Sequence, residues 1–260
     1  MKEFIKKFKK YNPFALYSAK AELKSEVSNS YLTWIWWILD PLLFMLVYVF
    51  MVDVIFKSNQ EKLPVFVMSG LLLWNFFNKN VMLSVKIITG NKSIISQKYI
   101  PKYMLVVQKI YVNFIKFLIS IGILVVLAIF YKVQLSFNVL YSIPLLILLL
   151  LVSFGISNIF AHFGVFIEDL ANIVQVLLRL MFYLSGIFYS IKDKLPNNLY
   201  DIFMRVNPMA YIIEDFRNVF MYQKGLNLEL YFYWVIIAIL ISILSVRLIN
   251  KHENSYAKVM

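Results

Sequence analysis

The chain has 260 residues, of which 61% are hydrophobic, and its mean hydropathy is +0.73. Soluble domains are nearer half apolar, so this composition excludes a soluble protein and predicts an all-α integral membrane protein. The formal net charge of +12 is concentrated in the N-terminus and the loops, where lysines set topology and contact anionic membrane lipids. We therefore expect membrane lipids, and no nucleic acid, as partners.

Residues 1–31 are expected to form a cytoplasmic basic arm followed by an interfacial amphipathic helix. Five of the first ten residues are lysines, and such a segment favours the cytoplasmic side. Pro13 suits the first turn of a helix. The residues that recur on one helical face after it are Leu16, Ala19, Leu23 and Val27. With charged residues elsewhere, this pattern predicts a helix lying on the inner leaflet.

The remaining residues, 32–260, are expected to form one transmembrane domain with about six spans. A spanning helix needs ~20 mainly apolar residues. The six apolar segments that approach or exceed this length are residues 31–56, 65–88, 103–130, 139–166, 173–189 and 230–249. An N-terminus inside the cell places the basic residues of the arm, of the loop 88–102 and of the C-terminal tail in the cytoplasm. Both termini are therefore predicted to be cytoplasmic.

Polar residues follow helical spacing along the second and third spans, and an aspartate lies in the first. The candidate set is Asp40, Asn75, Lys79, Lys109, Asn113 and Lys116. A charged side chain at the bilayer centre costs ~2.5–3.5 kcal/mol on insertion scales, so these groups are expected to face protein or water. The stripes predict a shared hydrophilic path. The alternative is that the lysines extend to the cytoplasmic surface, which suits Lys116 least because it lies near mid-membrane.

The stretch before the last span contains a helix, a break and a second helix. Asn207-Pro208 causes the break, because proline disfavours helix at the residue before it. The helix that follows is too short and too charged to cross a bilayer, with Glu214, Asp215 and Arg217 opposite an apolar face. We predict a re-entrant hairpin at the outer surface, buried in protein or lining a wet cavity. The alternative is an amphipathic helix lying passively on the headgroups.

The sequence lacks the motifs of an enzyme that acts alone. It contains no GxxxxGK[ST], so no P-loop for ATP is expected in this chain. No acidic or cysteine partner of its two histidines has ligand spacing, so no metal and no catalytic residue is assigned. A membrane enzyme acting on a lipid-linked sugar stays an alternative, with Asp201 and the adjacent pair Glu214-Asp215 as its acids.

Several motifs occur in the order seen in one family. They are SYLTWIWWILDPLL at residues 30–43, SGLLLWNFF at 69–77, QKYIPK at 97–102 and NPMAYIIEDFRNVF at 207–220. The chain resembles the permease subunits of type-2 ABC exporters, most closely the branch that exports polysaccharides and teichoic acids. The pattern of that branch includes LGxxW…PL, GLxxWxFF, KxxFP and NPxxYxxxxxR. Thr33 and Ile100 depart from it at a glycine and a phenylalanine position.

The resemblance implies two functional regions. The first is a cytoplasmic surface that docks on a separate ATPase and comprises Lys92, Gln97, Lys98, Tyr99, Pro101, Lys102, Glu168 and Asp169. The second is an outer re-entrant gate comprising Asn207, Pro208, Tyr211, Glu214, Asp215 and Arg217. The hydrophilic path would then be the channel.

The resemblance also implies partners. Such permeases work as homodimers with a pair of ATPase subunits, in the bacterial cytoplasmic (inner) membrane. MgATP binds the partner, and no cofactor is expected in this chain. The substrate would be a polyprenyl-linked polysaccharide, such as O-antigen, capsule, teichoic acid or another cell-wall glycan. An exporter of a small lipophilic compound would share the fold and is the second alternative.

Overall fold

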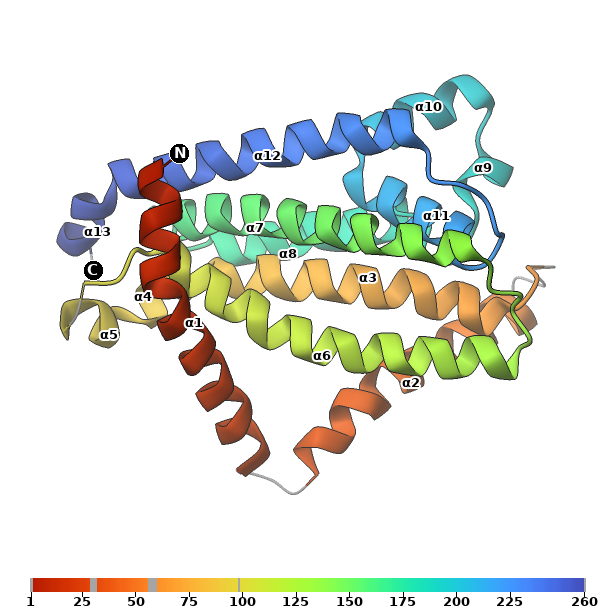
Figure 1. Cartoon of the computed structure of the whole chain (residues 1–260), viewed down its shortest axis with the longest axis horizontal. Helices are drawn as coiled ribbons and strands as arrows, with labels where there is room; N and C mark the ends of the chain where they lie inside the picture. The colour runs from red at the N-terminus through yellow and green to blue at the C-terminus, as the bar shows by residue number, and fades with distance from the viewer. Residues whose placement is uncertain (1, 29–31, 56–59, 98, 260) are drawn as a thin grey trace.

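The computed structural model describes residues 2–28, 32–55, 60–97 and 99–259, and these residues form helices and loops with no β-strand (Figure 1). The longer helices are α1 (Lys2–Ser28), α2 (Thr33–Phe50), α3 (Leu63–Ser84), α6 (Tyr103–Phe130), α7 (Ser142–Phe166), α8 (Leu170–Leu184) and α12 (Leu228–Lys251). The shorter ones are η1 (Met51–Ile55), α4 (Ile87–Gly90), α5 (Lys92–Gln97), η2 (Phe137–Tyr141), α9 (Ile191–Lys194), α10 (Asn197–Val206), α11 (Pro208–Phe220) and α13 (Glu253–Val259).

Four segments of the described chain are long and apolar enough to cross a membrane. They are Thr33–Val54, Tyr103–Phe130, Phe137–Phe166 and Leu228–Lys251, which match the first, third, fourth and sixth predicted spans. The second corresponds to α3, which ends at Ser84 rather than at residue 88. The fifth is the shorter α8, whose fifteen residues reach only ~22 Å at 1.5 Å per residue. Gly186, with φ of +66°, turns the chain soon after α8.

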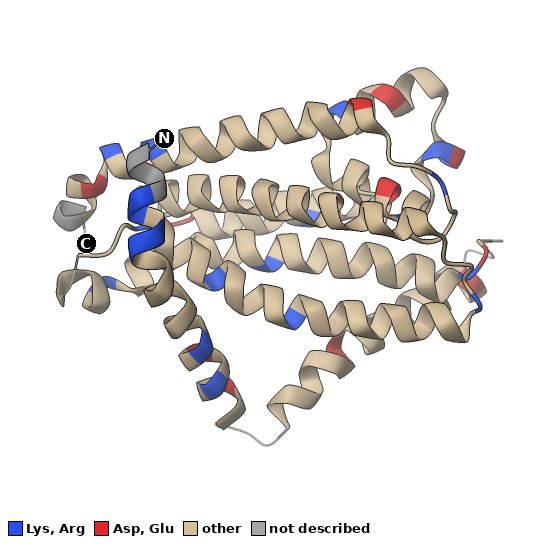
Figure 2. Cartoon of the chain, viewed as in Figure 1, with Lys and Arg blue, Asp and Glu red and all other residues tan. Residues whose placement is uncertain are grey.

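The bundle has two distinct ends (Figure 1). At the terminal end lie α4, α5, α13 and the start of α1. At the opposite end, which we call the hairpin end, the loops bond to one another: Lys62 Nζ donates to the Lys132 carbonyl at 3.2 Å, and Asn138 Nδ2 donates to the Gln223 carbonyl at 2.6 Å. Figure 2 shows charged residues gathered at these ends, with others along α1, α2, α3 and α6. As predicted, successive connections alternate between the two ends: α4 and α5 lie at the terminal end, and η2 and α9 lie at the hairpin end.

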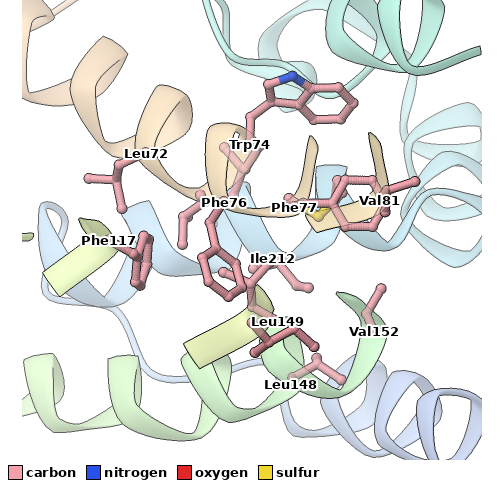
Figure 3. Packing of buried hydrophobic residues seen from close by; sticks show 14 of the residues in the cluster. Leu72, Trp74, Phe76, Phe77, Val81, Phe117, Leu148, Leu149, Val152 and Ile212 are labelled. Atoms are coloured by element: carbon pink, nitrogen blue, oxygen red, sulfur yellow. The ribbon is translucent and has the colours of Figure 1, made fainter. Parts of the chain in front are cut away.

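The core is centred on α3, which contacts α2, α6, α7 and α11. Figure 3 shows Trp74, Phe76 and Phe77 of α3 in the same cluster as Phe117 of α6 and Leu148 of α7. The ring centroids of Phe76 and Phe117 lie 4.9 Å apart. Most residues of α3 are buried by these neighbours, so α3 lies in the middle of the bundle rather than facing lipid.

The prediction for the N-terminal helix was wrong in two respects. α1 begins at Lys2, so Pro13 lies inside the helix and not in its first turn. Of the predicted apolar face, Ala19 is buried beside Ala15, whereas Leu16 and Val27 are exposed. The physical reason is that α1 packs closely against α6, and small residues permit this approach better than leucine or valine.

Candidate functional site

A polar cavity of about 220 Å³ lies between α2, α3 and α6. Five of the six residues predicted for the hydrophilic path line it, namely Asp40, Asn75, Lys79, Asn113 and Lys116. Trp36 and Trp37 of α2 line it as well. The sixth residue, Lys109, does not line this cavity, because its ammonium forms an ion pair with Glu22 of α1. Helical spacing therefore located most of the cavity correctly.

Each cavity lysine is paired within the chain. Lys79 Nζ lies 3.6 Å from Asp40 Oδ2, and Lys116 Nζ lies 2.6 Å from Glu26 Oε2. The Lys116 ammonium also stands over the Trp37 ring, 5.3 Å from its centroid. Lys109 and Lys116 thus both reach glutamates of α1.

The docking residues predicted at the terminal end divide into exposed and buried sets. The exposed residues are Lys92, Gln97, Tyr99, Glu168 and Asp169, while Pro101 and Lys102 are buried and Lys98 lies outside the described residues. Lys102 is only 6% exposed, because its Nζ is held 3.0 Å from Glu253 Oε1 of α13. It is therefore a packing residue and not part of the exposed surface.

Glu253 holds two residues of the predicted docking segment. Besides its ion pair with Lys102, it accepts a hydrogen bond from the Tyr99 hydroxyl at 3.1 Å. Burial, and then the neighbouring Glu253 carboxylate, raise the pKa of the Tyr99 hydroxyl above its ordinary value. α13 thus braces the loop between α5 and α6, a role that sequence analysis missed because nothing in the pattern linked residue 253 to residues 99–102.

The predicted break at Asn207-Pro208 is confirmed. α10 ends at Val206 and α11 begins at Pro208. Asn207 Oδ1 caps α11 by accepting hydrogen bonds from the Met209 and Ala210 amides at 3.0 and 3.1 Å. An asparagine cap followed by proline at the first helical position is a strong start signal.

α11 does not lie on a surface as a passive helix. It packs against α3 and α7, and its buried residues lie on all its sides. Asp215 is buried and accepts hydrogen bonds from the Tyr211 hydroxyl at 3.2 Å and the Asn227 amide at 3.0 Å. Glu214 is partly exposed and, with Tyr211 and Asp215, lines a second cavity of about 220 Å³.

Arg217 is the most deeply buried charged residue of α11, with 1% of its surface exposed. Its guanidinium donates to the carbonyls of Phe66, Gly186 and Ile187, with the shortest contacts at 2.7 Å, and to Ser69 Oγ at 3.3 Å. Within the described chain, carbonyl groups and one hydroxyl hold the guanidinium, and no carboxylate lies within ion-pair distance of it. Arg217 therefore ties α11 to α3 and to the turn after α8.

Residues 15–221 match the ABC-2 type transporter family. The chain belongs to this family. The similar relatives include two proteins from Klebsiella pneumoniae named O-antigen export system permease protein RfbA, each 26% identical over 240 residues that cover 92% of both chains. A protein of the same name from Myxococcus xanthus is 24% identical over 220 residues, covering 85% of both chains.

This ABC-2 permease is a multi-pass membrane transport protein that lacks catalytic function of its own and works with a separate ATPase subunit. The resemblance drawn from the motifs is confirmed. The family match begins in α1 and ends at residue 221, so it includes the polar cavity and the whole of α11. Glu253 lies beyond the matched region, although it contacts the loop within it.

Two acidic residues of the site were not singled out from the sequence. Glu22 and Glu26 are four residues apart on α1, and Lys109 and Lys116 are seven apart on α6. Both spacings place a pair of charges on one helical face. These spacings could have indicated that the two glutamates of α1 pair with the two lysines of α6. The prediction instead used the apolar residues of α1 to choose its packed face.

Proposed function

We propose that this ABC-2 permease is the membrane subunit of an exporter that moves a polyprenyl-linked polysaccharide across the bacterial cytoplasmic membrane. ATP hydrolysis would occur in the separate ATPase subunit, which binds MgATP. The observation that carries the proposal is a cavity between three helices of a membrane bundle that is lined by charged and aromatic residues. The names of the relatives from Klebsiella pneumoniae and Myxococcus xanthus support a glycan as cargo.

The two lysines of the cavity favour an anionic cargo over an uncharged lipophilic compound. Lys79 and Lys116 line the cavity together with Asp40 and Asn75. Charges inside a membrane are costly and mark polar pathways, and two ammonium groups attract a phosphate-bearing substrate. The glycan would pass along the hydrophilic path formed by Asp40, Asn75, Lys79, Asn113 and Lys116, with Lys109 beside it.

We further propose a homodimer with six spans in each protomer. α3 and α8 supply the two spans additional to the four long apolar segments. α10 and α11 form the re-entrant outer gate, with Asn207, Pro208, Tyr211 and Arg217 fixing its position and Glu214 and Asp215 lining the cavity beside it. Residues 1–31 form the arm and interfacial helix, and residues 32–260 form the transmembrane domain.

The first prediction concerns assembly with the ATPase. The purified chain is expected to hydrolyse no ATP alone and to copurify with its ATPase subunit when the two are coexpressed. Reversing three exposed charges of the terminal end, with Lys92→Glu, Glu168→Lys and Asp169→Lys together, should greatly reduce copurification, because electrostatic complementarity guides docking. The matched control is Lys194→Glu at the hairpin end. Undiminished copurification of the triple variant would count against this docking surface.

The second prediction concerns orientation. The chain has no cysteine, so single cysteines report their side of the membrane without background. An impermeant maleimide applied to intact cells should label Ser136→Cys and Asn197→Cys, at the hairpin end, and should not label Ser96→Cys or Ser255→Cys, at the terminal end. Ser58, a further position predicted to be outside, lies beyond the described residues. Labelling of Ser96→Cys in intact cells would reverse the proposed topology.

A further inference from the structure

We infer that Lys79 and Lys116 form a binding site for the diphosphate or phosphate group of the lipid-linked substrate. We further infer that Asp40 and Glu26 occupy this site as internal counterions until the ligand displaces them. The inference rests on the proposed function, since it places the anionic part of the substrate in the polar cavity. It adds a role for α1, which supplies one of the two counterions.

Two ammonium groups from different helices line the same cavity. Lys79 comes from α3 and Lys116 from α6, and the amide of Asn75 lies on the same wall. Lysine binds phosphate as a compact, flexible point charge. Two such cations with an amide donor beside them suit an anion that has several oxygen acceptors, because each oxygen can find a donor.

The counterions belong to helices at the edge of the bundle. Asp40 is on α2 and Glu26 is on α1, whereas both lysines are on the central helices α3 and α6. Both pairs keep some exposure to solvent, with the Lys116 and Glu26 side chains 25% and 31% exposed. A pair of this kind contributes little net stability and can exchange partners, because water still solvates both charges.

The contact between α1 and α6 depends strongly on polar groups. Glu22 accepts hydrogen bonds from Lys109 Nζ and from Gln108 Nε2, and the Tyr111 hydroxyl donates to Asn12 Oδ1 at 2.6 Å. The apolar contribution of α1 comes from the buried Ala15 and Ala19 and from Phe8, Tyr11 and Phe14, which pack against the core. α1 therefore contacts α6 through ion pairs as well as apolar packing, and an anion that competes for Lys116 would weaken that contact.

A diphosphate is the stronger competitor. It carries more negative charge than one carboxylate and offers enough acceptor oxygens for both ammonium groups that line the cavity. The adjoining face of α2 exposes apolar residues, among them Trp36, Leu43 and Leu46, which suit the hydrocarbon chain of a polyprenyl lipid. The cavity and α2 together fit an anionic head with an apolar tail.

The first test measures separation of α1 from α6. Ala19 is 1% exposed, so Ala19→Cys should react slowly with a maleimide while α1 is seated. In nanodiscs of phosphatidylcholine, added polyprenyl diphosphate is expected to raise the labelling rate about tenfold. Polyprenol should have no effect, and inorganic diphosphate should act only at much higher concentration. Equal acceleration by phosphatidylglycerol would overturn the inference, because any anionic lipid would then serve.

The second test measures binding of labelled polyprenyl diphosphate to the purified, full-length chain. Asp40→Asn/Glu26→Gln should tighten binding about tenfold, because both internal counterions are removed. Lys79→Gln/Lys116→Gln should weaken it at least tenfold, and Lys116→Gln/Glu26→Gln should also weaken it although that pair can still hydrogen-bond. Glu229→Gln, which removes the partner of Arg205 at the hairpin end, is the matched control and should change nothing.

Removing the acids is predicted to tighten lipid binding and removing the lysines to weaken it. These opposite changes distinguish a binding site from ion pairs that only stabilise the fold. If the ion pairs only brace the fold, removing the acids would weaken lipid binding or leave it unchanged, and the inference would be wrong. Unchanged binding to Lys79→Gln/Lys116→Gln, in a chain whose wild type supports glycan export in cells, would overturn the inference and leave the proposed function standing. Tight binding by a wild-type chain that supports no glycan export would contradict the proposed function instead.

Discussion

Arg217→Met is expected to be among the most damaging single substitutions in this permease, with a loss of ~2–6 kcal/mol in folding stability, because the buried Gly186 and Ile187 carbonyls lose their donor. Methionine fills much of the same space but cannot donate to the carbonyls of Phe66, Gly186 and Ile187. Each buried carbonyl left without a donor costs ~1–3 kcal/mol. The measurement is thermal unfolding of the purified variant, together with its yield in the membrane.

Arg205→Met provides the matched control for Arg217. Arg205 lies on α10 of the same hairpin and forms an exposed ion pair with Glu229, so its loss should cost no more than ~1 kcal/mol. Arg217→Lys should fall between the two, because one ammonium keeps the charge but cannot match a planar guanidinium that bonds several carbonyls. A wild-type melting temperature for Arg217→Met would contradict the view that this arginine ties α11 to α3.

Gly164→Ala is the second substitution expected to have a large effect. A Cβ built on Gly164 would lie 1.8 Å from the Val85 carbonyl oxygen and 2.8 Å from the Val85 carbonyl carbon. Both are backbone atoms, so no side-chain rotation can relieve the clash, and α7 would have to move away from the junction of α3 and α4. Overpacking of this kind typically costs ~1–3 kcal/mol, and the short distance places Gly164→Ala at or above the upper end.

Gly122→Ala distinguishes this clash from a general effect of adding a methyl group. Gly122 lies inside α6, and a Cβ there would meet no atom within 4 Å. Alanine is the better helix former by up to ~1 kcal/mol, so Gly122→Ala should leave stability unchanged or raise it slightly. Thermal unfolding of both variants in one detergent makes the comparison. Equal melting temperatures for the two would show that α7 does not approach Val85 as closely as described.

The polar cavity was predictable because helical periodicity fixes which residues share a face. Asn75 and Lys79 are four residues apart, as are Lys109 and Asn113, and a three-residue step then reaches Lys116. Residues three and four apart are neighbours on a helix surface. Two such stripes on consecutive spans therefore meet when the helices pack side by side. The capped start of α11 was predictable for an equally local reason, the Asn207-Pro208 pair.

Contacts between distant segments were not predictable in the same way. Two partners of Arg217, the carbonyls of Gly186 and Ile187, lie where the chain turns after α8, and sequence patterns do not show where a helix stops inside a bundle. Gly164 contacts Val85 across the terminal end with no spacing motif to mark it. The seating of α1 on α6 followed Ala15 and Ala19 rather than the larger apolar residues, because close approach of two backbones outweighed apolar area.

The central claim is that this chain and its ATPase subunit together move a polyprenyl-linked polysaccharide across a membrane. The most direct measurement is translocation of that lipid in proteoliposomes that contain both subunits, followed by the access of a glycan-degrading enzyme to the product. We predict transfer that requires ATP, both subunits and a hydrolysis-competent ATPase, and that fails with polyprenol alone. Transfer of a small lipophilic dye but not of the lipid-linked glycan, under conditions in which the ATPase is active, would contradict the account.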